Sequence, residues 1–176
     1  PSVNQRGEQA RKAIVFTAFS DTAEYLYEQI VPFAQELGLH CALVTGGGAT
    51  KTTLGKARYQ DILINFAPRA NKRQAMASMP QDAEIDLLIA TDCISEGQNL
   101  QDADLLINYD IHWNPVRLIQ RFGRIDRIGS LHDSIQMVNF WPTPDLNHYL
   151  KLKGRVESRM ALVDISATGE DNILAD

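Results

Sequence analysis

Short apolar runs alternate with helical segments along most of this chain, and this alternation constrains the fold more than any other feature. Five runs rich in β-branched and aliphatic residues predict strands at 12–19, 39–45, 85–91, 104–110 and 134–141. Strands that alternate with helices on short connections form a parallel sheet covered on both faces. The sequence therefore predicts an α/β fold of three layers with a mainly parallel central sheet.

The segments between the runs predict the covering elements. A helix is expected to start at 20–24, with Asp21 as its N-cap, and to end at Gly38 in spite of Pro32. The triple glycine that begins at Gly46 predicts a flexible polar loop up to about Lys56. The remaining expectations are a helix at 58–66, a helix or loop at 68–81, a short helix or loop at 92–100, a helix from Pro115 and a helix at 145–163.

Length and composition indicate one ordinary globular domain. The chain has 176 residues, of which 44% are hydrophobic and 22% charged. We expect a lead-in segment at 1–11, the domain at 12–163 and a frayed tail at 164–176. The net charge of −5 argues against a protein that coats nucleic acid, but it leaves room for a local basic strip.

The cysteines and the ends of the chain give expectations about location. Cys41 and Cys93 lie in apolar segments without a Cys-x-x-Cys pair, which predicts buried free thiols in a reducing cytoplasm. No run approaches the roughly 18 apolar residues of a membrane span, and no signal peptide is recognisable. The chain does not begin with Met, so we expect a piece of a longer polypeptide.

The segment from Pro115 to Gly129 predicts an amphipathic helix with a basic face. At about 100° per residue, one side carries apolar residues that should point inward and the other carries an amide among arginines. The inward set is Leu118, Ile119, Phe122 and Ile125, and the outward set is Arg117, Gln120, Arg124 and Arg127. Arg121 lies near the apolar side, where we expect an ion pair with Asp126 or Asp110. Converging guanidinium groups suit a multiply charged anion, although a merely solvated basic helix has the same pattern.

Two further stretches follow strands, where ligands bind in parallel sheets. Gly46 to Thr52 ends in Lys-Thr but lacks the last glycine of a phosphate-binding loop, so we expect at most a contact to a nucleic-acid phosphate there. Thr91 to Leu100 offers a hydroxyl, a glycine and an amide that suit phosphate or sugar. The four histidines are scattered, and we expect no metal site.

Together these motifs resemble motifs IV, V and VI of superfamily 2 helicases. The order and spacing are shared by Phe16 to Thr22, by Thr91-Asp with Glu96-Gly-x-Asn-Leu100, and by Gln120-Arg-x-Gly-Arg-x-Asp-Arg-Ile-Gly129. The Trp113-Asn-Pro115 turn resembles the Swi/Snf branch, and the last motif is most similar to bacterial members, including the RNA polymerase-recycling ATPases. The resemblance covers roughly residues 12 to 142. It implies a RecA-like domain, the C-terminal one of two motor lobes.

The resemblance also implies residue roles. In this family ATP binds between the lobes, and the first lobe carries the phosphate-binding loop and the magnesium site. Arg124 and Arg127 would be arginine fingers, and Gln120 would assist them near the phosphates. The positions expected near ATP are Glu96, Gly97 and Asn99, and those expected to bind phosphates of the tracked strand are Thr17, Ser20, Gly46 and Thr91.

The expected function is the second lobe of an ATP-dependent translocase on double-stranded DNA. Its partners would be the N-terminal lobe of the same polypeptide and, in addition, RNA polymerase or a nuclease. Two alternatives remain open. One is a strand-separating helicase of a restriction or defence system. The other is a non-catalytic α/β module whose arginine face binds a phosphorylated ligand or protein.

Overall fold

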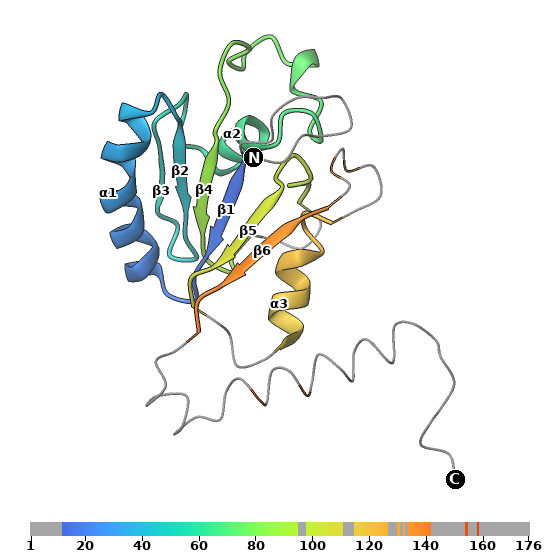
Figure 1. Ribbon diagram of the computed structural model, residues 1–176. Coiled ribbons are helices and arrows are strands. Elements are labelled where there is room, and N and C mark those ends of the chain that lie inside the picture. Colours follow the sequence, from blue (N-terminus) through green and yellow to red (C-terminus); the bar gives the residue numbers. More distant parts are fainter. Residues whose placement is uncertain are drawn as a thin grey trace.

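A computed structural model describes residues 12–94, 98–110, 115–126, 130, 132, 134–141, 154 and 158. Its centre is a six-stranded sheet with the order β3-β2-β4-β1-β5-β6 (Figure 1). The strands are β1 Ala13–Phe16, β2 Cys41–Val44, β3 Thr50–Thr52, β4 Leu87–Ala90, β5 Leu105–Asn108 and β6 Gln136–Asn139. All pairings are parallel except that of β2 with β3. The predicted RecA-like α/β fold with a mainly parallel sheet is confirmed, and each predicted strand contains an observed one.

Helices cover both faces of this sheet. Helix α1 (Ser20–Glu36) lies on one face, while α2 (Tyr59–Phe66) and α3 (Pro115–Phe122) lie on the other. Successive residues of a strand point to opposite faces. The side chain of Val15 accordingly packs in the α1 layer, whereas its neighbours Ile14 and Phe16 pack in the opposite layer. This alternation gives the three layers that the sequence predicted.

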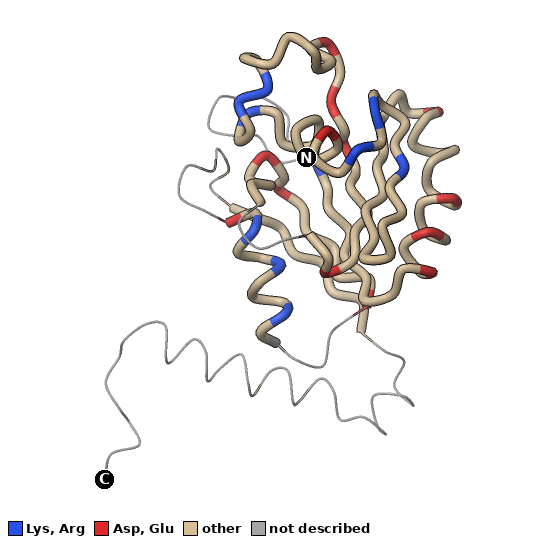
Figure 2. The backbone as a smooth tube through the Cα atoms, turned by 180° about the vertical axis from the view of Figure 1, so that it is seen from behind, with Lys and Arg blue, Asp and Glu red and all other residues tan. Residues whose placement is uncertain are grey.

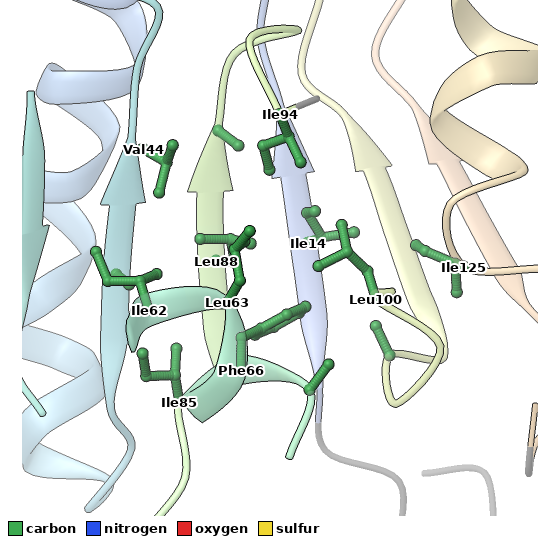
Figure 3. Packing of buried hydrophobic residues seen from close by; sticks show 14 of the residues in the cluster. Ile14, Val44, Ile62, Leu63, Phe66, Ile85, Leu88, Ile94, Leu100 and Ile125 are labelled. Carbon is green, nitrogen blue, oxygen red and sulfur yellow. The ribbon is translucent and has the colours of Figure 1, made fainter. Parts of the chain in front are cut away.

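The larger core lies between the sheet and α2. Its strand residues come from β1, β2, β4 and β5, and Figure 3 shows Ile14 and Leu88 near Leu63 and Phe66 of α2. Residues from the connections close its ends, namely Ile94, Leu100 and Ile125. Full burial of such side chains contributes about 1.5–3 kcal/mol each. The carboxyl ends of the strands are thereby held at fixed positions.

Helix α1 begins differently from the prediction and ends as predicted. Its N-cap is Phe19, without a side-chain cap hydrogen bond, so the expected N-cap role of Asp21 is wrong; Asp21 lies in the first turn. At the other end, Gly38 has a φ of +70°. The Leu39 amide donates to the Ala34 carbonyl at 2.8 Å and the Gly38 amide donates to that of Gln35 at 3.0 Å. This is the Schellman pattern, which glycine completes without steric strain.

The region predicted as a polar loop after Gly46 contains the edge strand β3. Val44 pairs with Thr50 and Ala42 pairs with Thr52, so β2 and β3 form a hairpin. The hydroxyl of Thr53 then accepts the Cys41 amide proton at 2.9 Å. The loop prediction was based on the glycines at 46–48. It overlooked the β-branched threonines that follow, whose conformational propensity favours a strand.

Other expectations have mixed outcomes. Helix α2 lies within the predicted 58–66 segment, and residues 68–81 contain a short 3₁₀ helix, Arg73–Ala75. The lead-in at 1–11, the tail at 164–176 and, apart from Gly154 and Ser158, the predicted helix at 145–163 lie outside the described residues. Within the described part of the chain, the structure contains no helix of the length and apolarity that a membrane crossing requires.

Candidate functional site

The carboxyl ends of four strands meet at one edge of the sheet. Phe16 is in register with Ala90 and with Asn108, and Ala90 is in register with Val44. The residues that follow these strand ends therefore lie along the same edge. Thr17, Ser20, Gly46 and Thr91, which were expected to bind phosphates, all lie there.

Thr17 is buried at this edge and forms a hydrogen bond to Asp110, two residues beyond the end of β5. Its hydroxyl donates to one carboxylate oxygen of Asp110, and the other oxygen accepts the Ala18 amide proton at 2.8 Å. The side chain of Thr17 is fully buried. Its hydroxyl thus fixes the connection between β1 and α1, while Ser20 begins the helix beside it.

Thr91 joins the ends of β2 and β4. Its hydroxyl accepts the Gly46 amide proton at 3.0 Å, and its own amide donates to the Val44 carbonyl at 3.1 Å. Gly46 is exposed, while Thr91 is buried. A Cβ atom on Gly46 would lie 3.4 Å from the Cβ of Cys93, which is ordinary contact. The structure brings these two predicted residues together.

Arg121 is the largest fully buried side chain at this edge, with 1% exposure. Its Nε and Nη2 donate to the two oxygens of Asp92 at 2.7 and 2.9 Å, and its Nη1 donates to Asn108 Oδ1 at 3.0 Å. The guanidinium carbon lies 5.3 Å from the centre of the Phe16 ring. A bidentate carboxylate pair is the strong form of this interaction.

The prediction for Arg121 was correct in part. It forms a buried ion pair, but the partner is Asp92 and neither Asp126 nor the carboxylate of Asp110; only the main-chain carbonyl of Asp110 accepts from it, at 3.4 Å. Sequence reasoning treated Asp92 as a motif residue only. The available signal was its position two residues after β4, at the edge that the Arg-bearing helix was expected to approach.

The anchored Arg121 fixes the rotation of α3. Leu118 is buried, and Ile125, just beyond the helix, is buried as well. Ile119, which was expected to point inward, is 36% exposed, so that expectation is wrong. The side of α3 that packs against the core lies between Leu118 and Arg121. On this side the arginine fills a position that a second apolar residue would otherwise occupy.

Of the predicted catalytic residues, Gln120 lies in α3 on the side away from Leu118, and Arg124 follows two residues after the helix ends. Arg117 is exposed, and Gln120 and Arg124 are half-buried. Figure 2 shows basic residues at intervals along this helix. The Arg124 carbonyl accepts the amide proton of Leu100 at 3.3 Å. This bond brings Arg124 next to Asn99, so one predicted catalytic residue and one predicted ATP-binding residue adjoin.

Three other predicted residues, Glu96, Gly97 and Arg127, lie outside the described part of the chain, as does Trp113. Within the described part, no three His, Cys, Asp or Glu side chains gather into a group that could hold a metal ion.

Residues 3–129 match the family model described as the helicase conserved C-terminal domain. An uncharacterized ATP-dependent helicase of Bacillus subtilis, YqhH, is 54% identical over 50 residues, which cover 28% of this chain and 9% of that protein. The RNA polymerase-associated protein RapA of Serratia proteamaculans is 44% identical over 77 residues, or 44% of this chain and 8% of RapA.

A solved structure supports the same fold. The C-terminal part of the Fun30 ATPase domain superposes with a TM-score of 0.58 at 16% identity, covering 83% of this chain and 39% of that one. This chain spans less than a tenth of the length of the two relatives. The family model nevertheless matches most of the chain, in the region that carries the motif residues. The chain therefore belongs to the family of helicase conserved C-terminal domains.

Proposed function

We propose that this chain is the second motor lobe of an ATP-dependent translocase on double-stranded DNA. The observation that carries the proposal is the buried pair of Arg121 with Asp92, which locks the rotation of α3. Gln120 of α3 and Arg124, two residues beyond the end of the helix, are both half-buried. We expect their side chains to face the cleft at the carboxyl edge of the sheet, where α/β folds bind ligands.

The chemistry of ATP hydrolysis suits this arrangement. Phosphoryl transfer spreads negative charge over the γ-phosphate oxygens, so catalysis depends largely on positive charge held in position. Arg124 and Arg127 would supply that charge, and Gln120 would assist near the phosphates or the attacking water. Glu96, Gly97 and Asn99 would lie against the ATP ribose side of the cleft. The first lobe would contribute the phosphate-binding loop and the magnesium ion.

The other end of the same edge would hold the nucleic acid. Helix α1 begins there without a side-chain cap, so the positive end of its dipole faces the edge. Ser20 and the exposed Gly46 can approach a phosphate directly. Thr17 and Thr91 would act at least partly through the loops that their hydroxyls hold. Closure of the two lobes over ATP would shift these contacts and move the strand.

Location and partners are part of the proposal. RapA is named for its association with RNA polymerase, and this chain would serve a cytoplasmic motor that acts on polymerase or a nuclease.

The test uses the full-length protein that contains both lobes. DNA-stimulated ATP hydrolysis should fall by about 10³-fold or more on Arg127→Ala, by analogy with arginine fingers in GTPases. The isolated chain of residues 1–176 should hydrolyse no ATP, because the phosphate-binding loop is absent from it. Turnover by the isolated chain, or unchanged turnover of the full-length variant, would refute the proposal. Unchanged turnover would instead favour a non-catalytic module.

A further inference from the structure

A pocket of about 310 Å³ lies at the edge of the sheet opposite to the candidate site. One wall is α2, and the other walls are the connection that leaves β3 and the connection that leads to β4. Thr53 donates its amide proton to the carbonyl of Cys41, the first residue of β2, at 2.9 Å, and Ile85, two residues before β4, donates to the carbonyl of Asn65 in α2 at 3.0 Å. Figure 1 shows both connections at the end of the sheet where β2 and β4 begin. The pocket is therefore separate from the carboxyl edge.

The side chain of Asn65 lines this pocket and is 1% exposed. Its Oδ1 accepts from Nη1 of Arg73 at 3.2 Å. Because an arginine can only donate, this bond fixes which end of the amide is the oxygen. The nitrogen faces Gly55, where an added Cβ would lie 3.4 Å from Nδ2. Gly55 lines the same pocket, so the Nδ2 group is directed into it.

The surroundings of Arg73 hold the amide of Asn65 in this orientation. Arg73 is 3% exposed, its Nη1 also donates to the Ala83 carbonyl at 2.9 Å, and its Nη2 lies 3.7 Å from one carboxylate oxygen of Glu84. Lys12 binds the other oxygen of Glu84 at 2.8 Å. Turning the amide over would leave two buried donors facing each other, which is unfavourable in an interior.

The Nδ2 group of Asn65 is a buried donor that lacks a protein acceptor. Within the part of the chain that the structure describes, it has no hydrogen-bond partner. Buried polar groups in folded proteins are hydrogen-bonded in the great majority of cases, and each exception needs an explanation. A ligand of this pocket should therefore present an acceptor atom to Asn65.

The charges around the pocket favour an acceptor with a single negative charge. Lys56 and Arg58 line it and are exposed. Asp61 lines it as well and is 6% exposed, and its carboxylate pairs with Nε of Arg58 at 2.7 Å. Two cations and one anion leave a single positive charge. A carboxylate balances that charge, whereas a phosphate dianion would bring a second negative charge close to Asp61.

We propose that this pocket binds a small organic molecule through its carboxylate group. The carboxylate would accept a hydrogen bond from Asn65 and lie in the field of Lys56. The rest of the molecule would lie against Met79 and Pro80, which supply apolar wall. The pocket volume is at the small end of the range for ligand sites, which is about 300–1,000 Å³. Duplex DNA cannot reach a side chain that is 1% exposed, so the site is independent of the proposed motor function.

Titration of the isotope-labelled 176-residue chain with sodium benzoate tests the site by NMR. The side-chain amide signals of Asn65 and the backbone signal of Gly55 should shift saturably, in the millimolar range. Asn65→Asp keeps an oxygen for Arg73 and replaces the free donor with an anionic oxygen. This change should weaken benzoate binding, followed at Gly55, by about tenfold or more. Absence of a saturable shift, or equal affinity of the two chains, would overturn the proposal.

Two further comparisons decide the matter if Asn65→Asp fails to fold. Lys56→Ala, an exposed change, should weaken benzoate binding by about threefold. Lys72→Ala is the matched control, because Lys72 is also exposed but does not line the pocket, and it should leave the affinity unaltered. Equal effects of the two changes would contradict the site.

The choice of ligand tests the carboxylate itself. Benzamide, the uncharged counterpart, should bind the unmodified chain about fivefold more weakly than benzoate, because its oxygen makes no charge-assisted hydrogen bond. Inorganic phosphate should also bind more weakly than benzoate. Equal binding of benzamide, or stronger binding of phosphate, would overturn the assignment to a carboxylate.

Discussion

Arg121 carries its charge into the interior because the end of every neighbouring strand offers it a partner. Asp92 follows β4, Asn108 ends β5, and Phe16 ends β1, and all three contact the guanidinium group. Asn108 in turn donates to Asn139 at the end of β6 at 2.8 Å. One side chain therefore ties α3 to the carboxyl edge on which the candidate site is built.

Replacing Arg121 with alanine should lower the free energy of unfolding by about 3 kcal/mol, because it leaves Asp92 and buried Asn108 without their partner. Urea denaturation of the 176-residue chain measures this. Arg117→Ala, an exposed change on the same helix, should stay within about 0.5 kcal/mol. Equal stability of the two variants would show that the buried pair does not hold α3.

Cys41 should resist alkylation in the folded protein. Burial, with a smaller effect of the Asp86 charge, raises the pKa of its thiol from 9.0 to about 11. Because the folded state keeps its proton where the unfolded state loses it, this thiol should lower stability as pH rises from about 9 to about 11. Iodoacetamide at pH 8 should modify Cys93, which is half-buried, before Cys41. Preferential modification of Cys41 would contradict this.

At this scale the sequence predicted which side chains face inward better than it predicted their partners. Helical periodicity placed Arg121 near the apolar side, and the structure buries it there. Its partner Asp92 is 29 residues away in the chain, while the two proposed partners were closer. Periodicity reports direction within one element, and it contains no information on which strand end lies opposite.

At the scale of elements, local signals worked where they were strong. Gly38 ended α1 as predicted because a left-handed residue is needed there. Asp21 was a wrong N-cap because the helix starts at Ser20, closer to β1 than the polar pattern indicated. The strand β3 was missed because the glycines at 46–48 indicated a loop, and its three residues form a strand through their pairing with β2.

Replacing Gly38 with alanine should lower the free energy of unfolding by about 1 kcal/mol. No atom lies within 4 Å of the added Cβ, so the loss would come from the positive φ alone. Thermal or urea unfolding measures it, and Gln35→Ala, an exposed position in the last turn, serves as the control. A stability equal to that of the unmodified chain would show that the Schellman turn is dispensable.

For the whole molecule, the parallel sheet made the candidate site predictable. Ligands of such sheets bind beyond the carboxyl ends of the strands, and four predicted residues lie at that edge. The hydrogen-bond partners of their hydroxyl and amide groups could not be predicted. Thr17 bonds to Asp110 and Thr91 bonds to Gly46, pairings that depend on how the loops close after folding.

We propose that this lobe contributes positive charge to a reaction centre whose other half lies on another lobe. The most direct measurement is the steady-state rate of DNA-stimulated ATP hydrolysis by the full-length protein carrying Arg124→Ala. Arg58→Ala is the control, since Arg58 is an exposed residue beside α2 that has no proposed role in ATP hydrolysis. We expect kcat to fall by about 10³-fold for Arg124→Ala, with KM for ATP changed far less, and to stay unaltered for Arg58→Ala. Equal turnover by both variants would contradict the account.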